Sequence, residues 1–424
     1  MAGRAQTIRL GLSRMERLYD ANKQSWKAFH VAGTNGKGSI CAYLSALCSS
    51  SNISHGRFTS PFVHHPSDSI HINGKPISVQ EYLEHENFIR RLPGFNDDPP
   101  SPFEMMTLIA FRAFAENKVS YGVVETGMGG RLDSTNVMRK KSVNIFSRID
   151  MDHNQFLGSN ILAIAAEKSG IITTPGTPCI VDDTSDYHVL DVIAHKAQEM
   201  QAPLHLISDD TTLTSLLRRE CPKHKFAPHE VTNLTCALLA FSKVFPNAFA
   251  MDDIPEILPK LARTRMPGRL QRLDISHRLP KRKAPILLDG AHNMAGVEAL
   301  STYVAHGLRN DEPVTWVVSL SSPRDEEALD LIRALVQDRD SIVFTEYGSR
   351  STELERESRP PAISAKALKT RCERRILPED RIHSEPDVTK ALQLAANISQ
   401  NGPMVVTGSL YLGSEILNWH KESE

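Results

Sequence analysis

The chain has 424 residues, more than a single hydrophobic core usually serves, so we expect two domains. Its 49 basic and 50 acidic residues give a net charge of -1, which argues against a protein that coats nucleic acid or lies on a membrane surface. The six cysteines show no C-x-x-C spacing and indicate neither a zinc site nor a disulfide framework. No apolar run approaches the roughly 20 residues of a membrane span. We expect a cytosolic protein, with a short mitochondrial presequence as the open alternative.

Apolar strand-like runs alternate with helix-length amphipathic segments, which predicts an α/β fold with a mainly parallel sheet. In the first half of the chain we expect strands at 28–32, 56–59, 122–125, 143–147 and 179–181. Helices are expected at 39–49, 79–91, 103–117, 160–169, 187–199 and 231–245. Asn73 and Gly74, between two short extended runs, predict a tight hairpin turn.

A glycine-rich turn follows the first predicted strand, and its residues are Gly33, Thr34, Asn35, Gly36, Lys37, Gly38 and Ser39. Backbone amides of such a turn close around phosphate oxygens, the lysine adds a positive charge, and the serine hydroxyl can reach a Mg²⁺ ion. A glycine separates Lys37 from Ser39, so the strict triphosphate-binding pattern is not met, and an isolated turn of this kind is more often structural. The strand before it and the helix after it favour ATP as the ligand.

Acidic residues follow two other predicted strands. Glu125 ends the strand at 122–125, and Asp152 and His153 follow the strand at 143–147. Ligands of an open parallel sheet bind at the carboxyl ends of its strands, so these residues are expected to face the same crevice as the glycine-rich turn. A solvated loop is the alternative at both places. Glycines downstream of Glu125 favour a Mg²⁺ ligand there, and His153 is a second candidate, although imidazole is not the preferred ligand of a hard cation.

The stretch 274–284 is rich in charge and breaks the periodicity, which predicts a linker between a domain at 1–273 and a domain at 285–424. The second domain is expected to have strands at 286–289, 315–319, 342–345 and 404–407 and helices at 295–306, 326–338, 364–370 and 388–397. Its first strand delivers Asp289 and His292 to its carboxyl end. Arg269 precedes the linker and suits bidentate contact with phosphate, a surface arginine in a turn being the alternative.

Taken together, these residues resemble the folylpolyglutamate synthase and dihydrofolate synthase family, a branch of the Mur-type ATP-dependent amide ligases. The resemblance covers nearly the whole chain and rests on the segments 30–39, 59–62, 127–136, 152–153, 167–171, 267–269, 289–293 and 408–412. It implies an N-terminal P-loop nucleotide-binding domain with a mainly parallel sheet and a C-terminal Rossmann-like α/β domain. The opening and closing segments are most similar to fungal dihydrofolate synthases.

The resemblance also implies a reaction. ATP would phosphorylate the carboxylate of dihydropteroate, and the amine of L-glutamate would attack the acyl phosphate to give dihydrofolate, ADP and phosphate. The scheme is chemically coherent, because a carboxylate is a poor electrophile until phosphorylation supplies a leaving group. These small molecules are the implied partners, and we expect a monomer with no nucleic-acid or membrane partner.

Roles for individual residues follow from the same resemblance. Contacts with ATP are implied for the glycine-rich turn and for Asn233, Arg269 and Asp289. Ser39 would bind one Mg²⁺ ion, and a second ion would be bound by Ser60, Glu125 and His153. Lys168, in the segment 167–171, is expected to be carbamylated.

The catalytic residues implied by the resemblance are Lys37, Lys168 and His292. The residues implied to hold the pterin and glutamate substrates are Ser101, Phe103, Asp133, Ser134 and Ser409. Phe103 suits stacking on a flat heterocycle, although a phenylalanine that opens an apolar helix is more often part of a core. One stretch, 319–325, departs from the family pattern, and Arg324 is its candidate replacement for a family lysine.

Two other functions stay open at this point. A folylpolyglutamate synthase, or an enzyme with both activities, would share the fold and chemistry but extend the glutamate tail of reduced folates. A non-catalytic nucleotide-binding regulator would keep the fold without the reaction. The presence of Lys37, Glu125, His153 and Lys168 counts against the regulator.

Overall fold

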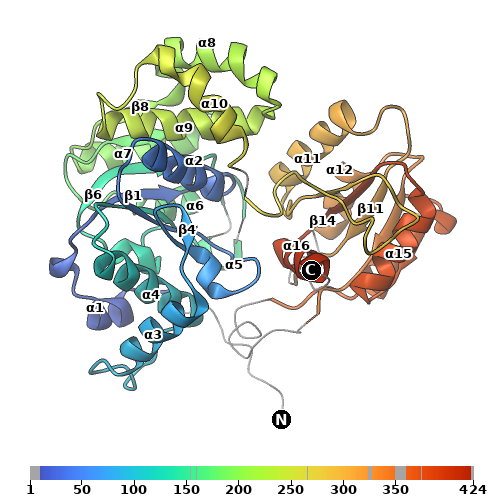
Figure 1. Cartoon of the computed structure of the whole chain (residues 1–424), viewed down its shortest axis with the longest axis horizontal. Helices are drawn as coiled ribbons and strands as arrows, with labels where there is room; N and C mark the ends of the chain where they lie inside the picture. The colour runs from blue at the N-terminus through green and yellow to red at the C-terminus, as the bar shows by residue number, and fades with distance from the viewer. Residues whose placement is uncertain are drawn as a thin grey trace. The chain divides into compact units, whose positions relative to one another are not determined.

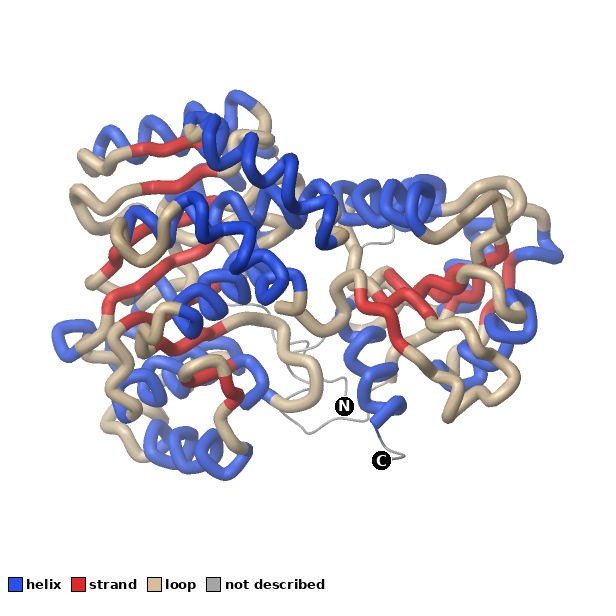
Figure 2. Tube along the Cα trace, turned by 45° about the horizontal axis from the view of Figure 1, so that its top comes forward, coloured by secondary structure: helices blue, strands red, loops and turns tan. Residues whose placement is uncertain are grey.

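The computed structural model divides the chain into two compact units, Met1–Met266 and Pro267–Glu424. It describes residues 10–152, 154–158, 160–264, 266–322, 327–348, 360–373 and 375–421. Each unit is built on its own sheet with helices packed against it (Figures 1 and 2). The predicted α/β class with mainly parallel sheets is confirmed.

The sheet of the first unit has eight strands in the order β4-β3-β2-β5-β1-β6-β7-β8. The strands are β1 Lys27–Ala32, β2 His55–Phe58, β3 Ile70–Ile72, β4 Lys75–Pro76, β5 Tyr121–Glu125, β6 Lys141–Phe146, β7 Cys179–Val181 and β8 Leu204–Leu206. All neighbouring pairs from β2 to β8 are parallel, and only β3 and β4 pair in the antiparallel sense. The carboxyl ends of the parallel strands therefore share one edge, which is where ligands of such sheets bind.

Ten helices of the first unit lie within its described residues. They are α1 Ser13–Leu18, α2 Lys37–Ser50, α3 Val79–Arg90, α4 Pro102–Glu116, α5 Asn154–Leu157, α6 Ile161–Ser169, α7 Tyr187–Glu199, α8 Thr211–Glu220, α9 Pro228–Val244 and α10 Ile254–Ala262. Helices α2 and α9 pack over one face of the sheet, and α4 packs over the other (Figure 1). This double cover explains why β1 reads as a continuous apolar run: Phe29 and Val31 enter one core, while Ala28 enters the other.

The predicted strands and helices of this unit are present, with ends that shift by a few residues. The hairpin is also confirmed, because β3 and β4 pair on either side of Asn73 and Gly74. Both residues have positive φ, 49° and 82°, as a two-residue hairpin turn requires. Strand β8 and helices α1, α5, α8 and α10 were not predicted.

The sheet of the second unit has six strands in the order β13-β12-β11-β14-β10-β9. The strands are β9 Gln271–Leu273, β10 Ile286–Leu288, β11 Thr315–Val318, β12 Ser341–Phe344, β13 Ile382–Ser384 and β14 Met404–Thr407. Its described helices are α11 Met294–Gly307, α12 Ala328–Leu335, α14 Ala365–Cys372, α15 Val388–Ser399 and α16 Leu410–Lys421. Only β9, at one edge, runs antiparallel to its neighbour.

The division between the units lies earlier than the predicted boundary at residue 273, because β9 pairs with β10 and so belongs to the second sheet. The predicted linker at 274–284 is also part of the second unit. Its residue Arg282 is 2% exposed and donates hydrogen bonds to the carbonyls of Gln400 and Gly402 at 2.9 and 3.0 Å. The charged residues around a proline predicted a linker, but the hydrogen bonds of Arg282 attach this stretch to the segment before β14. In the described part of the chain, no helix has the length and apolar character to cross a bilayer.

Candidate functional site

The glycine-rich turn connects the carboxyl end of β1 to the first turn of α2, as the sequence predicts for a phosphate-binding loop. Gly36 precedes the helix with φ 91°, and Gly33 has φ 145°. A side chain at either glycine would also clash with a neighbouring residue. A Cβ atom at Gly33 would lie 1.9 Å from Oγ of Ser147, and one at Gly36 would lie 2.1 Å from Oδ1 of Asn233 on α9. The structure thus brings Asn233, predicted as a nucleotide contact, against the loop.

Two lysines converge on this loop. Nζ of Lys37 donates hydrogen bonds to the carbonyl oxygens of Gly33 and Thr34 at 3.1 and 3.2 Å. Nζ of Lys168, in the last turn of α6, donates to the same Gly33 oxygen at 2.7 Å. Burial, with the nearby charge of Lys37, lowers the pKa of Lys168 to about 7. A substantial part of Lys168 is therefore an uncharged amine near neutral pH.

The carboxylate of Glu125 lies beside the same loop, at the end of β5. Its Oε2 accepts a hydrogen bond from the amide of Ser60 at 3.1 Å, and a Cβ atom at Gly38 would lie 3.5 Å from this oxygen. The side chain is only 5% exposed. Ser39 lies in the first turn of α2, so the predicted metal ligands Ser39, Ser60 and Glu125 come from elements around one loop. His153 lies outside the described residues.

The donor set here suits Mg²⁺, because hydroxyl and carboxylate oxygens are the ligands of a hard cation. Among the residues that the structure describes, no three His, Cys, Asp or Glu side chains form a group able to hold a metal ion.

The residues predicted to bind the pterin lie around the first turn of α4. Phe103 is partly exposed and stacks on Phe58, with ring centroids 5.8 Å apart and an interplanar angle of 25°. A Cβ atom at Gly127 would lie 2.4 Å from the same ring. The ring of Phe103 is thus held between β2 and the glycine-rich segment after β5, which fixes its orientation.

The three other predicted pterin residues have partners inside the protein. Ser101 caps α4, because its hydroxyl accepts the amide of Glu104. Ser134 shares a 2.7 Å hydrogen bond with the hydroxyl of Thr107. Asp133 accepts the amide of Met128 at 2.9 Å and both the amide and the hydroxyl of Thr135 at 3.0 and 2.5 Å.

Asp133 is 4% exposed. Burial raises its pKa, and the hydrogen bonds from Thr135 and from the segment after β5 oppose that rise. These bonds show that Asp133 shapes its own loop. Binding of a substrate by Ser101, Phe103, Asp133 and Ser134 stays a prediction.

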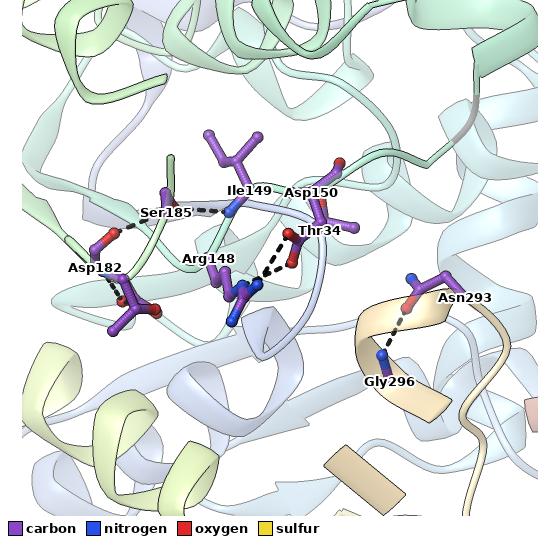
Figure 3. Close-up of polar contacts among 9 residues, drawn as sticks. Thr34, Arg148, Ile149, Asp150, Asp182, Ser185, Asn293 and Gly296 are labelled. Carbon is purple, nitrogen blue, oxygen red and sulfur yellow. Dashed lines mark hydrogen bonds and ion pairs between the residues drawn. The ribbon is translucent and has the colours of Figure 1, made fainter. Parts of the chain in front are cut away.

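In the second unit, the predicted residues gather at the carboxyl ends of the neighbouring strands β10 and β14. Asp289 accepts the amides of Leu270 and Ala291, both at 2.9 Å, and so fixes the turn that carries Arg269. His292 shares a 2.8 Å hydrogen bond between Nδ1 and the carbonyl of Gly290. The hydroxyl of Ser409 accepts the amide of Tyr411 at 3.1 Å at the start of α16. Asn293, next to His292, caps α11 through the amide of Gly296 (Figure 3).

Comparison with known proteins identifies the family. Residues 271–419 match the family model described as "Dihydrofolate synthetase, C-terminal domain". The dihydrofolate synthetase of Saccharomyces cerevisiae is 30% identical over 431 residues, which are 97% of this chain and 98% of the yeast protein. The chain belongs to the dihydrofolate synthase and folylpolyglutamate synthase family.

Other members of this family align over similar lengths. The dihydrofolate synthase/folylpolyglutamate synthase of Bacillus subtilis is 30% identical over 433 residues, covering 96% of this chain and 94% of the relative. The structure of Mycobacterium tuberculosis folylpolyglutamate synthase complexed with ADP and AMPPCP has a TM-score of 0.79 at 26% identity. It covers 98% of this chain and 96% of that chain. The predicted family and its two-part α/β fold are thereby confirmed.

The sequence analysis did not single out Lys141, a buried lysine whose hydrogen bonds hold two segments of the site together. Lys141, at the start of β6, is 7% exposed, and burial lowers its pKa to about 7. Its Nζ donates to Oδ1 of Asn136 and to the carbonyl of Ile171, both at 2.7 Å. Nδ2 of Asn136 donates in turn to the carbonyl of Gly170 at 3.0 Å. The pair therefore ties the segment after β5 to the segment that carries Lys168. A lysine at the start of an apolar strand was the available signal.

Proposed function

We propose that this protein ligates L-glutamate to dihydropteroate at the expense of ATP, through an acyl phosphate, to give dihydrofolate, ADP and phosphate. The convergence of Lys37, Lys168 and Glu125 on the loop after β1 supports an ATP-dependent reaction. The full-length relationship to the yeast dihydrofolate synthetase supports dihydropteroate as the acceptor.

The loop residues bind and orient the nucleotide. Backbone amides between Gly33 and Ser39 would surround the phosphates of ATP, with the amino end of α2 facing them. Lys37 would leave the carbonyls of Gly33 and Thr34 and neutralise charge on the phosphoryl group as it transfers. Asn233, Arg269 and Asp289 are proposed as further nucleotide contacts.

Two Mg²⁺ ions are proposed, held by oxygen ligands. Ser39 would bind one ion with the nucleotide, and Ser60, Glu125 and His153 would bind the other. When bound, Mg²⁺ screens the negative charge of the phosphates. Glu125, buried next to Gly38, would hold its ion close to the loop.

Lys168 is proposed to carry a carbamate. Its uncharged amine would attack the carbon of CO₂, an N–C bond would form as one C=O π bond opens onto oxygen, and one proton would leave the nitrogen for solvent, so that a neutral amine becomes a carbamate anion. The pKa of about 7, caused by burial and by Lys37, supports this because the uncharged amine is the reacting form. An anion there would face Lys37, and burial would strengthen that attraction.

The glutamate half of the reaction is assigned to the second unit. His292 and Ser409 lie at the carboxyl ends of β10 and β14, and we propose that they contact the transferring phosphate and the incoming amino acid. The acyl phosphate must meet the amine of glutamate before water does, so orienting contacts of this kind raise the rate and protect the intermediate.

Turnover by the purified protein tests the proposal. We expect ADP release that requires both glutamate and dihydropteroate, with dihydrofolate as the product. ADP release without a glutamate requirement would contradict a ligase and favour a nucleotide-binding regulator.

The second candidate is a folylpolyglutamate synthase or an enzyme with both activities. The Bacillus subtilis relative, named for both, is as similar as the yeast relative. Elongation of tetrahydrofolate at a rate equal to or above that with dihydropteroate would favour this candidate over a dedicated dihydrofolate synthase.

A further inference from the structure

The hydroxyl group of Thr34 is engaged twice by a single residue across the sheet. It donates a hydrogen bond to the carbonyl of Asp150 at 2.9 Å and accepts one from the amide of Asp150 at 3.0 Å. The amide of Thr34 donates to the carbonyl of Arg148 at 2.9 Å. Figure 3 shows Thr34 lying against this segment. These three hydrogen bonds, which we call the Thr34 bracket, therefore join the loop after β1 to the segment after β6.

These bonds bear on what Thr34 can offer a nucleotide. Phosphate oxygens accept hydrogen bonds, and a threonine hydroxyl has one hydrogen to donate. That hydrogen is already directed at Asp150. A direct contact with phosphate would require the bracket to break.

The segment on the far side of the bracket is itself held in place. The amide of Ile149 donates to Oγ of Ser185 at 3.0 Å, and Ser185 donates to the carbonyl of Asp182 at 3.3 Å (Figure 3). The side chain of Ile149 is 1% exposed, and the Arg148 guanidinium pairs with the Asp150 carboxylate at 2.9 Å. Thr34 is thus attached to a fixed support and not to a free loop.

The carbonyls of the same loop have other partners. Those of Gly33 and Thr34 point to the ammonium groups of Lys37 and Lys168. If Lys37 turned toward a phosphate, its own hydrogen bonds to Gly33 and Thr34 would break, while the hydrogen bonds between Thr34 and Asp150 would remain.

We infer that Thr34 is a positioning residue, which holds the phosphate-binding loop in its binding conformation through the Asp150 backbone and the Ser185 support. The inference rests on the proposed binding of ATP by this loop, but it does not depend on the identity of the folate substrate. It assigns Thr34 a role different from the direct nucleotide contact expected from the sequence.

Binding of Mg²⁺–ADP to the full chain, measured by titration calorimetry, tests the inference. Thr34→Val keeps the shape but removes the hydroxyl, and we expect its dissociation constant to rise about tenfold, since small misplacements of a site are costly. Thr34→Ser keeps the hydroxyl and should bind like the wild type. Thr214→Val removes a matched hydroxyl on α8, which donates to the carbonyl of Asp210 before that helix, and should leave binding unchanged.

Ser185→Ala separates positioning from direct contact. This variant removes the support of Ile149 without changing the loop itself, so we expect weaker binding in the same direction as Thr34→Val. Because both changes act through one chain of bonds, the double variant should bind no more weakly than Thr34→Val alone.

Three results would overturn the inference: wild-type binding by either Thr34→Val or Ser185→Ala, equal loss in Thr34→Ser, or additive effects of Thr34→Val and Ser185→Ala. Thermal melting with and without ADP identifies a variant that is merely unfolded. If the wild type itself fails to bind Mg²⁺–ADP, the proposed function fails, and that result is distinct from the three above.

Discussion

The ammonium group of Lys168 lies 2.7 Å from the carbonyl oxygen of Gly33, so the end of α6 donates a hydrogen bond into the first residue of the phosphate-binding loop. Lys37 donates to the same oxygen at 3.1 Å. Two ammonium groups on one carbonyl repel each other, which adds to the effect of burial on Lys168. Because the two lysines share one acceptor but come from different helices, the role of each is tested by its own substitution.

Lys37→Ala should abolish ligation and leave the fold intact. The ammonium group of Lys37 donates to the loop carbonyls of Gly33 and Thr34, so its loss should remove charge compensation and leave the apolar cores unchanged. Circular dichroism and steady-state turnover on one preparation provide the measurement. Lys260→Ala, at an exposed position of α10, is the control. Near-wild-type turnover by folded Lys37→Ala would rule out the phosphate-loop assignment.

Lys168→Ala and Lys168→Arg should both be inactive, and acetate should partly restore only the alanine variant. A short carboxylate can replace a carbamate in the space left by alanine, whereas arginine keeps a positive charge there. Carbon-13 NMR of protein kept in labelled bicarbonate should show a carbamate signal that disappears in both variants. An active Lys168→Arg variant without that signal in the wild type would refute carbamylation.

Glu125→Gln should raise the Mg²⁺ concentration for half-maximal activity about tenfold or more, because the substitution keeps the size and removes the charge that a hard cation prefers. Activity is measured across a magnesium titration. Glu256→Gln, at an exposed position of α10, should behave like the wild type. A titration of Glu125→Gln that superimposes on that of the wild type would show that Glu125 is not a ligand.

Phe103→Ala should raise KM for dihydropteroate about tenfold, since an aromatic contact together with its buried area is of that order. KM for ATP should not change, because the ring of Phe103 packs against Phe58 on β2 and Gly127 after β5. Steady-state kinetics with each substrate varied separate the two effects. Phe88→Ala, at a position 45% exposed on α3, is the control. A parallel rise in both KM values would mean that the substitution disturbs the whole unit.

Asp340→Asn should destabilise the second unit. Burial alone would raise the pKa of Asp340, but hydrogen bonds from Arg309, Trp316 and two backbone amides bring it below the usual value. A carboxyl with a lowered pKa stabilises the fold above its unfolded pKa, and that contribution is lost as the pH falls through the folded pKa.

We therefore expect Asp340→Asn to cost about 3 kcal/mol of unfolding free energy at pH 7, because it leaves part of a buried ion pair unmatched. The difference from the wild type should shrink below about pH 4, where the carboxyl of the unfolded wild type takes up its proton, and should go on shrinking until the pH falls below the lowered pKa of the folded carboxyl. Urea unfolding at several pH values measures both, with exposed Asp338→Asn as control. A difference that stays constant down to pH 3 would show that the Asp340 charge is not what stabilises the fold.

Long apolar runs gave the most reliable predictions of the fold. The run at 28–32 and the turn after it became β1 and the glycine-rich loop that leads into α2, since an apolar strand followed by glycines has few other solutions. The three-residue strands β7 and β10 were predicted because all their residues are apolar, whereas β8, β9 and β13, equally short, each contain a polar residue and show no apolar run. Arg282 was assigned to a linker because sequence cannot show that a guanidinium meets distant carbonyls.

The site shows the same limit. Residue types and order identified Lys168 through a family resemblance, but Gly33 lies far away in the sequence, and only folding reveals their hydrogen bond. The bracket between Thr34 and Asp150 was also hidden, because it uses the backbone of Asp150 and leaves no signature in residue type.

Gly127 and the ring of Phe103 occupy a shared volume, since even a methyl group at Gly127 would come within 2.4 Å of the ring. The identities of the two residues are therefore linked: any side chain gained at position 127 must be matched by one lost at position 103. A variant with a smaller residue in place of Phe103 has room for alanine at position 127, whereas a chain that keeps the aromatic ring in this place does not. The packing around Phe58 and the backbone freedom of the segment after β5 can consequently change only as a pair.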